Sequence, residues 1–99
     1  MNTIVNTLVG NYLKSKRIEY GMTGAEVGKL LHVSQQQVSR YENGVNTISL
    51  NLVLLFLDKL DLSVESFFIY LLKEIENDIK DNEKNIKDCL YTDPKFILV

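Results

Sequence analysis

The side chains best suited to chemistry in this 99-residue chain lie in one short polar segment near its middle. Two neighbouring glutamines, a serine and an arginine recur there at a spacing that places them along one edge of a helix. Glutamine can bond bidentately to adenine in the major groove of DNA, and arginine can bond to guanine in the same way. This edge predicts base reading, against the alternative of a short solvated helix. Its residues are Gln35, Gln36, Ser39 and Arg40.

Local signals predict that the segment forms a helix of barely two turns. Ser34 can act as the N-cap, and Gln37 three residues later completes a capping box. The Asn-Gly pair at 43–44 supplies a left-handed stop. The apolar residues Val38 and Tyr41 can attach one edge of the helix to a core. A helix this short does not persist alone in water, so the rest of the chain must hold it.

Composition narrows the class of protein. The length and the apolar and charged fractions are those of one ordinary soluble globular domain. The apolar run 50–57 is far too short to cross a bilayer, and the N-terminus lacks a secretory pattern. The single cysteine, Cys89, forms no internal disulfide, and with the single histidine, His32, it makes no metal cluster. We therefore expect a cytoplasmic protein with no membrane partner, metal, cofactor or small-molecule ligand.

Charge is divided unevenly along the chain, although the formal net charge is only −2. Five basic and three acidic residues precede Ser49, whereas six basic and ten acidic residues lie from Ser49 onward. The half that holds the polar segment is therefore net basic. A basic region is the electrostatic footprint of a nucleic-acid-binding protein, and this modest imbalance predicts salt-sensitive binding of middling strength.

Apolar periodicity predicts four further helices and hence an all-α, five-helix fold. The first carries one apolar stripe from residue 4 and ends at Gly21. The second opens with a capping box at Thr23–Glu26, and a tight turn joins it to the polar helix, which together describe a helix-turn-helix. The helix over 50–60 is apolar nearly all the way round, so we expect it to be buried on several sides. Ser63 opens the fifth helix.

The C-terminal third continues with a looser seven-residue apolar rhythm from Leu72. Its Asn and Asp residues are weak helix formers, so two interpretations stay open: a helix that pairs with another subunit, and a frayed solvated extension. We divide the chain into a domain at 1–69 and a C-terminal helical extension and tail at 70–99. The proposed dimerisation residues, which could instead only cover the fourth helix, are Phe68, Leu71, Leu72, Ile75 and Ile79, joined by the apolar tail 96–99.

Five segments between residues 10 and 68, taken in their order along the chain, resemble the phage-repressor type of helix-turn-helix. This is the lambda and 434 Cro/CI-like or XRE family. These segments are Lys14–Ile18, Thr23–Glu26, Ser34–Val38, Glu42–Gly44 and Leu62–Phe67. Among bacterial members, the chain is most similar to small regulators associated with fimbrial operons. The resemblance implies a repressor-like DNA-binding domain.

The resemblance also assigns roles to individual residues. The polar edge matches the family's base-reading positions, and Arg17 and Glu42 match an internal ion pair. Gly24 stands where the family often has a glutamine that grips a phosphate, and the loop after Gly44 lacks basic residues. Both departures imply weaker backbone anchoring, which dimerisation would offset. The positions matched to phosphate or loop contacts are Thr23, Gly24, Ser34, Gln37, Asn43 and Asn46.

These residues bear on three classes of function. The leading hypothesis is a sequence-specific transcriptional regulator that binds double-stranded DNA as a homodimer, with its recognition helix in the major groove. The alternative is a protein-interaction module of the same fold, such as an antitoxin or an antirepressor. An enzyme has little support, because no activated nucleophile, plausible carboxylate pair, phosphate-cradling loop or metal cluster is visible in the sequence.

Overall fold

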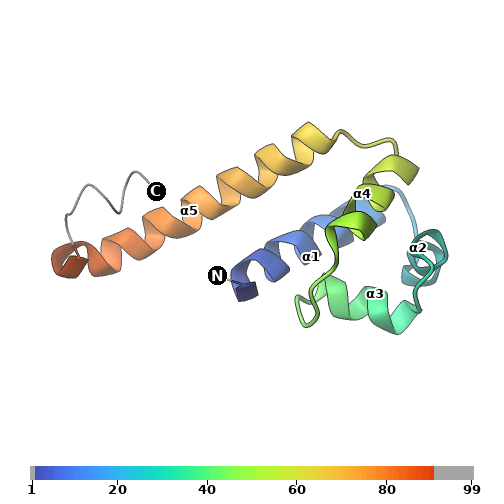
Figure 1. Ribbon diagram of the computed structural model, residues 1–99, viewed down its shortest axis with the longest axis horizontal. Helices are drawn as coiled ribbons and strands as arrows, with labels where there is room; N and C mark the ends of the chain where they lie inside the picture. Colours follow the sequence, from blue (N-terminus) through green and yellow to red (C-terminus); the bar gives the residue numbers. More distant parts are fainter. Residues whose placement is uncertain (1, 91–99) are drawn as a thin grey trace.

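The chain folds into five α-helices, and no strand occurs among the residues that are described. The computed structural model describes the backbone of residues 2–90 and the side chains of residues 4–80. The predicted all-α fold class is confirmed (Figure 1). The helices are α1 (Asn2–Glu19), α2 (Gly24–Leu31), α3 (Gln35–Glu42), α4 (Leu50–Lys59) and α5 (Val64–Leu90).

The core lies where the five helices meet. The helix α2 packs against α3 and α4, while α1 packs against α3 and α5. Phe56 and Leu57 of α4 are fully buried at the centre, together with Phe67 from the first turn of α5. In this way α1 and α4 hold the short α2–α3 pair, which could not persist alone.

Serine and threonine caps begin four of the helices. The Thr23 hydroxyl accepts a hydrogen bond from the Glu26 amide, and the Glu26 carboxylate accepts one from the Thr23 amide, so this capping box is complete. Ser49 and Ser63 cap α4 and α5 in the simpler way, by accepting from one backbone amide. The predictions for Thr23 and Ser63 are confirmed.

The predicted capping box at the start of α3 is wrong in one half. Ser34 Oγ accepts from the Gln37 amide at 3.0 Å, but the return bond from Gln37 to the Ser34 amide is absent from this described segment. The amide group of Gln37 is neutral, whereas the matching Glu26 is a carboxylate that makes a stronger, charge-assisted bond. The backbone amide of Ser34 is left for another partner.

The turns that follow the helices use left-handed backbone. Gly21 (φ 67°) and Gly44 (φ 72°) lie just after α1 and α3, as their positions in the sequence predicted. His32 ends α2 with φ 59° and donates its backbone amide to the carbonyls of Gly28 and Lys29. His32 is exposed in the turn between α2 and α3, and the sequence did not indicate its left-handed conformation.

The prediction that α4 is buried on several sides is wrong. Val53, Phe56 and Leu57 face the core, but Leu50 and Leu54 are 58% and 39% exposed. The other helices of this small chain cover only one face of α4, and its apolar excess lies outside that face. An exposed apolar face of this kind needs a further partner or stays in water.

The helix α5 runs beside α1 in the opposite direction and continues well past the start of α1 (Figure 1). Tyr12 of α1 meets the rings of Phe67 and Tyr70 at centroid distances of 4.9 and 5.3 Å. The Tyr70 hydroxyl donates to the Leu8 carbonyl at 3.1 Å. The predicted boundary between residues 69 and 70 falls inside this helix, and the apolar tail 96–99 lies outside the described residues.

Candidate DNA interface

The candidate interface centres on α3, which is amphipathic with one buried and one exposed edge. Val38 and Tyr41 are buried in the core and hold the inner edge. The side chains of the outer edge are all exposed. We call this outer edge the reading edge, and it consists of Gln35, Gln36, Ser39 and Arg40.

A glycine that the sequence analysis missed sets the angle between α2 and α3. A Cβ atom at Gly28 would lie only 2.6 Å from the carbonyl oxygen of Val33, so a larger residue would push the turn away. The Val33 amide donates to the Gly28 carbonyl at 2.9 Å and closes the turn. A glycine inside a helical pattern was the available signal, because it often marks close packing.

Close approach also joins α1 to the end of α3. A Cβ atom at Gly10 would lie 2.3 Å from the Tyr41 carbonyl oxygen, so α1 can cross here only without a side chain. The same end of α3 carries Glu42, which is 8% exposed. Backbone contact and the charged group together fix α3 against α1.

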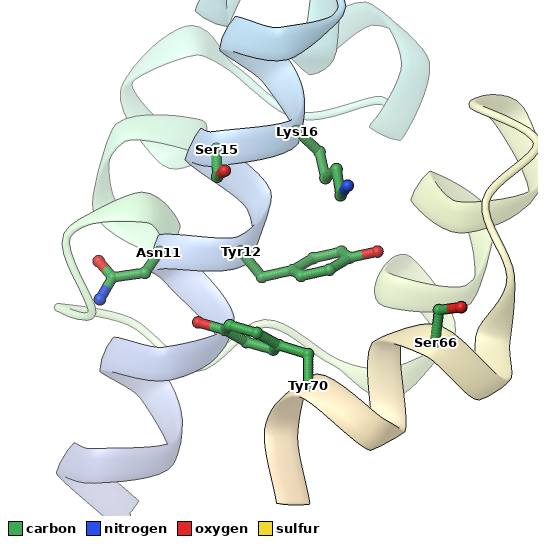
Figure 2. A pocket seen from close by; sticks show the side chains of 6 residues that line it. All are labelled: Asn11, Tyr12, Ser15, Lys16, Ser66 and Tyr70. Carbon is green, nitrogen blue, oxygen red and sulfur yellow. The ribbon is translucent and has the colours of Figure 1, made fainter. Parts of the chain in front are cut away.

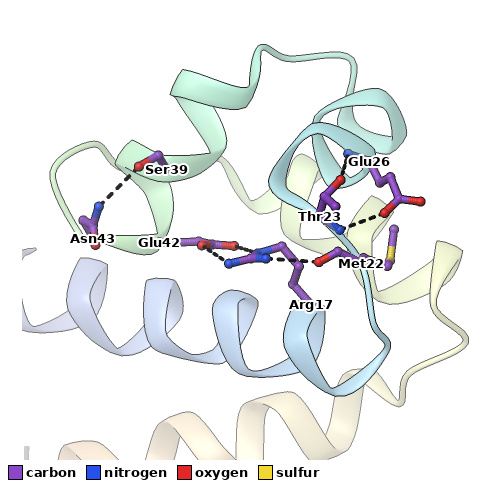
Figure 3. A network of polar contacts seen from close by, with 7 residues as sticks. All are labelled: Arg17, Met22, Thr23, Glu26, Ser39, Glu42 and Asn43. Carbon is purple, nitrogen blue, oxygen red and sulfur yellow. Dashed lines mark hydrogen bonds and ion pairs between the residues drawn. The ribbon is translucent and has the colours of Figure 1, made fainter.

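The ion pair between α1 and α3 is bidentate and partly buried (Figure 3). The Nε and Nη2 atoms of Arg17 donate to the two carboxylate oxygens of Glu42 at 2.6 and 3.1 Å. Nη1 donates to the Met22 carbonyl at 3.0 Å, which adds the loop before α2. The hydrogen bond with Glu42 raises the pKa of Arg17 above its ordinary value. One guanidinium therefore ties three segments of the helix-turn-helix together.

The starts of α2 and α3 lie side by side. A Cβ atom placed on Gly24 would contact Cγ of Gln35 at 3.5 Å. The free amides at a helix N-terminus attract anions such as phosphate. The Thr23 hydroxyl, which was predicted to contact phosphate, is engaged in its own capping box. The hydrogen bond from the Thr23 amide lowers the pKa of Glu26, whose carboxylate lies at the same helix start.

The last predicted contacts lie at the other end of α3. Asn43 is exposed, and its side-chain amide donates to the Ser39 hydroxyl at 3.4 Å (Figure 3). Asn46 is half-buried in the following loop, and its backbone amide donates to the Arg40 carbonyl. Both predicted positions are thus linked to residues of the reading edge. Ser34 and Gln37 complete the set at the start of the helix.

A shallow groove of about 400 Å³ lies elsewhere, between α1 and the start of α5 (Figure 2). The rings of Tyr12 and Tyr70 line it, and burial raises the pKa of both phenols. Lys16 lies 5.8 Å from the Tyr12 ring centroid and forms an ion pair with Glu19 at 3.2 Å. None of the residues that line the groove belongs to the candidate interface.

The part of the chain that the structure describes contains neither a membrane-spanning helix nor a metal-binding cluster. Within it, no helix is long and apolar enough to cross a membrane. The same residues contain no group of three or more His, Cys, Asp or Glu side chains that could hold a metal ion.

Comparison with known proteins agrees with this arrangement. Residues 13–67 match the family model HTH_3, described as helix-turn-helix, which covers more than half of the chain. The chain therefore belongs to the HTH_3 helix-turn-helix family. The matched segment runs from within α1 to the first turn of α5 and includes the whole reading edge.

Individual relatives are also regulators. Two uncharacterized HTH-type transcriptional regulators, from Rickettsia conorii and Rickettsia prowazekii, are each 27% identical over 64 residues. These alignments cover 65% of this chain but only 51% and 49% of the relatives, so the chain spans about half of their length.

Solved structures share the fold. The wild-type restriction-modification controller protein C.Esp1396I is 25% identical with a TM-score of 0.64, over 74% of this chain and 95% of its own. The clp gene regulator ClgR from Corynebacterium glutamicum has a TM-score of 0.67 at 22% identity, over 84% of this chain and 90% of its own.

Proposed function

We propose that this protein is a sequence-specific transcriptional regulator that binds double-stranded DNA as a homodimer and places α3 in the major groove. The observation that carries the proposal is the reading edge itself. Its four side chains are exposed and polar, while the opposite edge of the same helix is buried and apolar. Such a helix presents its hydrogen-bonding groups to base edges while its domain lies against the phosphate backbone.

The polar residues on and around α3 fit two roles, base reading and positioning. Gln35 and Gln36 lie in the first turn of α3, where base edges are nearest in this motif. Ser39 and Arg40 follow one turn later on the same edge. The proposed phosphate and loop contacts orient the helix without reading sequence. These contacts are Thr23, Gly24, Ser34, Gln37, Asn43 and Asn46.

Dimerisation through α5 is the second part of the proposal. One recognition helix contacts only a few base pairs, which is too few to select one site in a genome. Phe68, Leu72 and Ile79 are 39%, 60% and 48% exposed on α5, and Leu71 and Ile75 are half-buried beside them. We call these five residues the α5 stripe. Pairing two stripes would remove apolar surface from water and set two recognition helices roughly 34 Å apart.

The direct test is a footprint on genomic DNA of the source organism. We expect protection of a two-part site whose half-sites are separated by about one DNA turn. A matched measurement on random DNA should give much weaker, strongly salt-dependent binding. Equal affinity for all sequences, or no binding to DNA, would contradict the proposal. A protected site beside fimbrial genes would support the narrower proposal that the protein is a fimbrial-operon regulator.

A second candidate function is a protein-interaction module of the same fold, such as an antitoxin or an antirepressor. The exposed Leu50 and Leu54 on α4 favour it, because they form an apolar face outside the α5 stripe. Stable co-purification with a toxin, combined with no sequence preference on DNA, would support this function over the first.

A further inference from the structure

Gly24, the first residue of α2, is a glycine that the backbone does not require. Its φ is not positive, and a Cβ atom there would meet Gln35 only at ordinary contact distances, 3.5 Å to Cγ and 3.9 Å to Nε2. At Gly10 and Gly28, by contrast, a Cβ atom would lie within 2.6 Å of a carbonyl oxygen. The packing of the fold thus explains those two glycines but not Gly24.

The side chain that a Cβ atom at Gly24 would contact belongs to Gln35, the first residue of the reading edge. It is exposed, and its amide forms no hydrogen bond within the side chains that the structure describes, residues 4–80. Gly24 lies beside its stem but has no side chain there to pack against it. A glutamine without lateral support keeps several rotamers, whereas bidentate bonding to adenine needs one orientation of the amide.

We infer that Gly24 sets the specificity of base reading by leaving Gln35 free to turn. This inference rests on the proposed function, because it needs Gln35 to face a base pair. With Gly24, the stem of Gln35 can adopt more than one rotamer, so its amide can reach and tolerate more than one base. A methyl group at this position would pack against the stem of Gln35 and restrict the amide to fewer orientations. Gly24 is thus a positioning residue that acts through its neighbour.

The experiment compares the wild-type protein with Gly24→Ala on variants of the footprinted site in which each base pair is changed in turn. We expect the preference at one base pair of each half-site to rise about 3- to 10-fold. The ratios at the other base pairs should stay unchanged. The effect should disappear in a Gln35→Ala background and persist in the matched Gln36→Ala background.

A measurement without DNA gives a second test. In the free protein, NMR relaxation of the side-chain amide of Gln35 should show restricted motion in Gly24→Ala, while Gln36 stays as mobile as in the wild type. An affinity change that is the same at every base pair would show that Gly24 acts on backbone anchoring or helix stability, and would overturn the inference. Unchanged preferences with an unchanged Gln35 signal would overturn it as well.

Failure of the proposed function has a different signature. If the wild-type protein shows no sequence preference, then Gln35 reads no base pair. That result would overturn both proposals together. A wild-type protein with a clear site, combined with an indifferent Gly24→Ala variant, overturns this inference alone.

Discussion

The helices α3 and α5 are both amphipathic, but they expose opposite chemistries. The exposed edge of α3 is polar and can donate and accept hydrogen bonds, whereas the exposed stripe of α5 is apolar. A polar edge gains from a partner that presents ordered hydrogen-bonding groups, such as base edges. An apolar stripe gains from any partner that removes it from water. The comparison therefore separates a polar surface, which we propose binds DNA, from an apolar surface, which we propose binds a second subunit.

The two helices are also held in different ways. The position of α3 depends on the bidentate pair between Arg17 and Glu42 as well as on the buried Val38 and Tyr41. The start of α5 is held by rings, with Tyr12 against Phe67 and Tyr70. Hydrogen bonds and ion pairs depend on geometry, which suits a helix that must present side chains in register. Apolar contacts are less directional and tolerate a long helix that continues past the start of α1.

The largest effect should come from the α5 stripe. Replacing both Leu72 and Ile75 by Asp should leave a folded monomer whose affinity for a two-part site is lower by about 10²- to 10⁴-fold, because the second half-site no longer adds avidity. Sedimentation and DNA titration measure the two consequences. Asn77→Asp is the matched control, since it adds a charge at an exposed position of the same helix outside the stripe. A wild type that is monomeric at micromolar concentration, or a double variant that remains dimeric, would contradict this interface.

The ion pair should have the next largest effect. Arg17→Ala or Glu42→Ala should lower the free energy of unfolding by roughly 3–5 kcal/mol, because each change leaves a partly buried charge without its partner. Denaturant titration measures this loss. Lys16→Ala provides the control, since its ion pair with Glu19 is solvent-exposed and should contribute little. A double-mutant cycle without coupling between Arg17 and Glu42 would reject the pairing.

Base reading should have a moderate effect that is confined to specific DNA. Gln35→Ala or Gln36→Ala should each weaken binding to the footprinted site by about 1–3 kcal/mol and change binding to random DNA little. Arg40→Ala should weaken specific binding at least as much. Parallel titrations of both kinds of DNA separate the effects. Equal losses on specific and random DNA would contradict the assignment of the reading edge.

The smallest effects on stability should come from the helix caps. The capping box of α2 is complete, whereas that of α3 is incomplete. Thr23→Ala and Ser34→Ala should each destabilise the fold by about 0.5–2 kcal/mol. Only the cap of α2 should make the free energy of unfolding depend on pH in the acid range. The pKa of Glu26 lies below its usual value of 4.5 in the folded state, so its contribution is present above pH 4.5 and is lost as the pH falls through the lowered pKa.

Unfolding of wild type and Glu26→Gln, measured from pH 6 downward, tests this dependence. The wild type should lose more stability below pH 4.5 than the variant does, because the variant has no carboxylate to protonate. Identical pH profiles would show that the return bond of the capping box contributes nothing to stability.

The sequence by itself determined the features that depend on neighbours three or four residues apart. A cap and the amide it bonds are such neighbours, and so are the buried pair Val38 and Tyr41 on α3. The reading edge was predictable for the same reason, since helical spacing decides which side chains share an edge. The all-α class follows from the same periodicity.

Only the tertiary structure decided the features that depend on which helix or turn packs against a given residue. The excess of apolar residues on α4 predicted burial on several sides, but the other helices reach only one side, so Leu50 and Leu54 stay exposed. The close approaches at Gly10 and Gly28 bring together residues that are distant in sequence or separated by a turn. The contact between Gly24 and Gln35 has the same origin, because the angle between two helices sets which side chains meet, and periodicity within either helix contains no information about that angle.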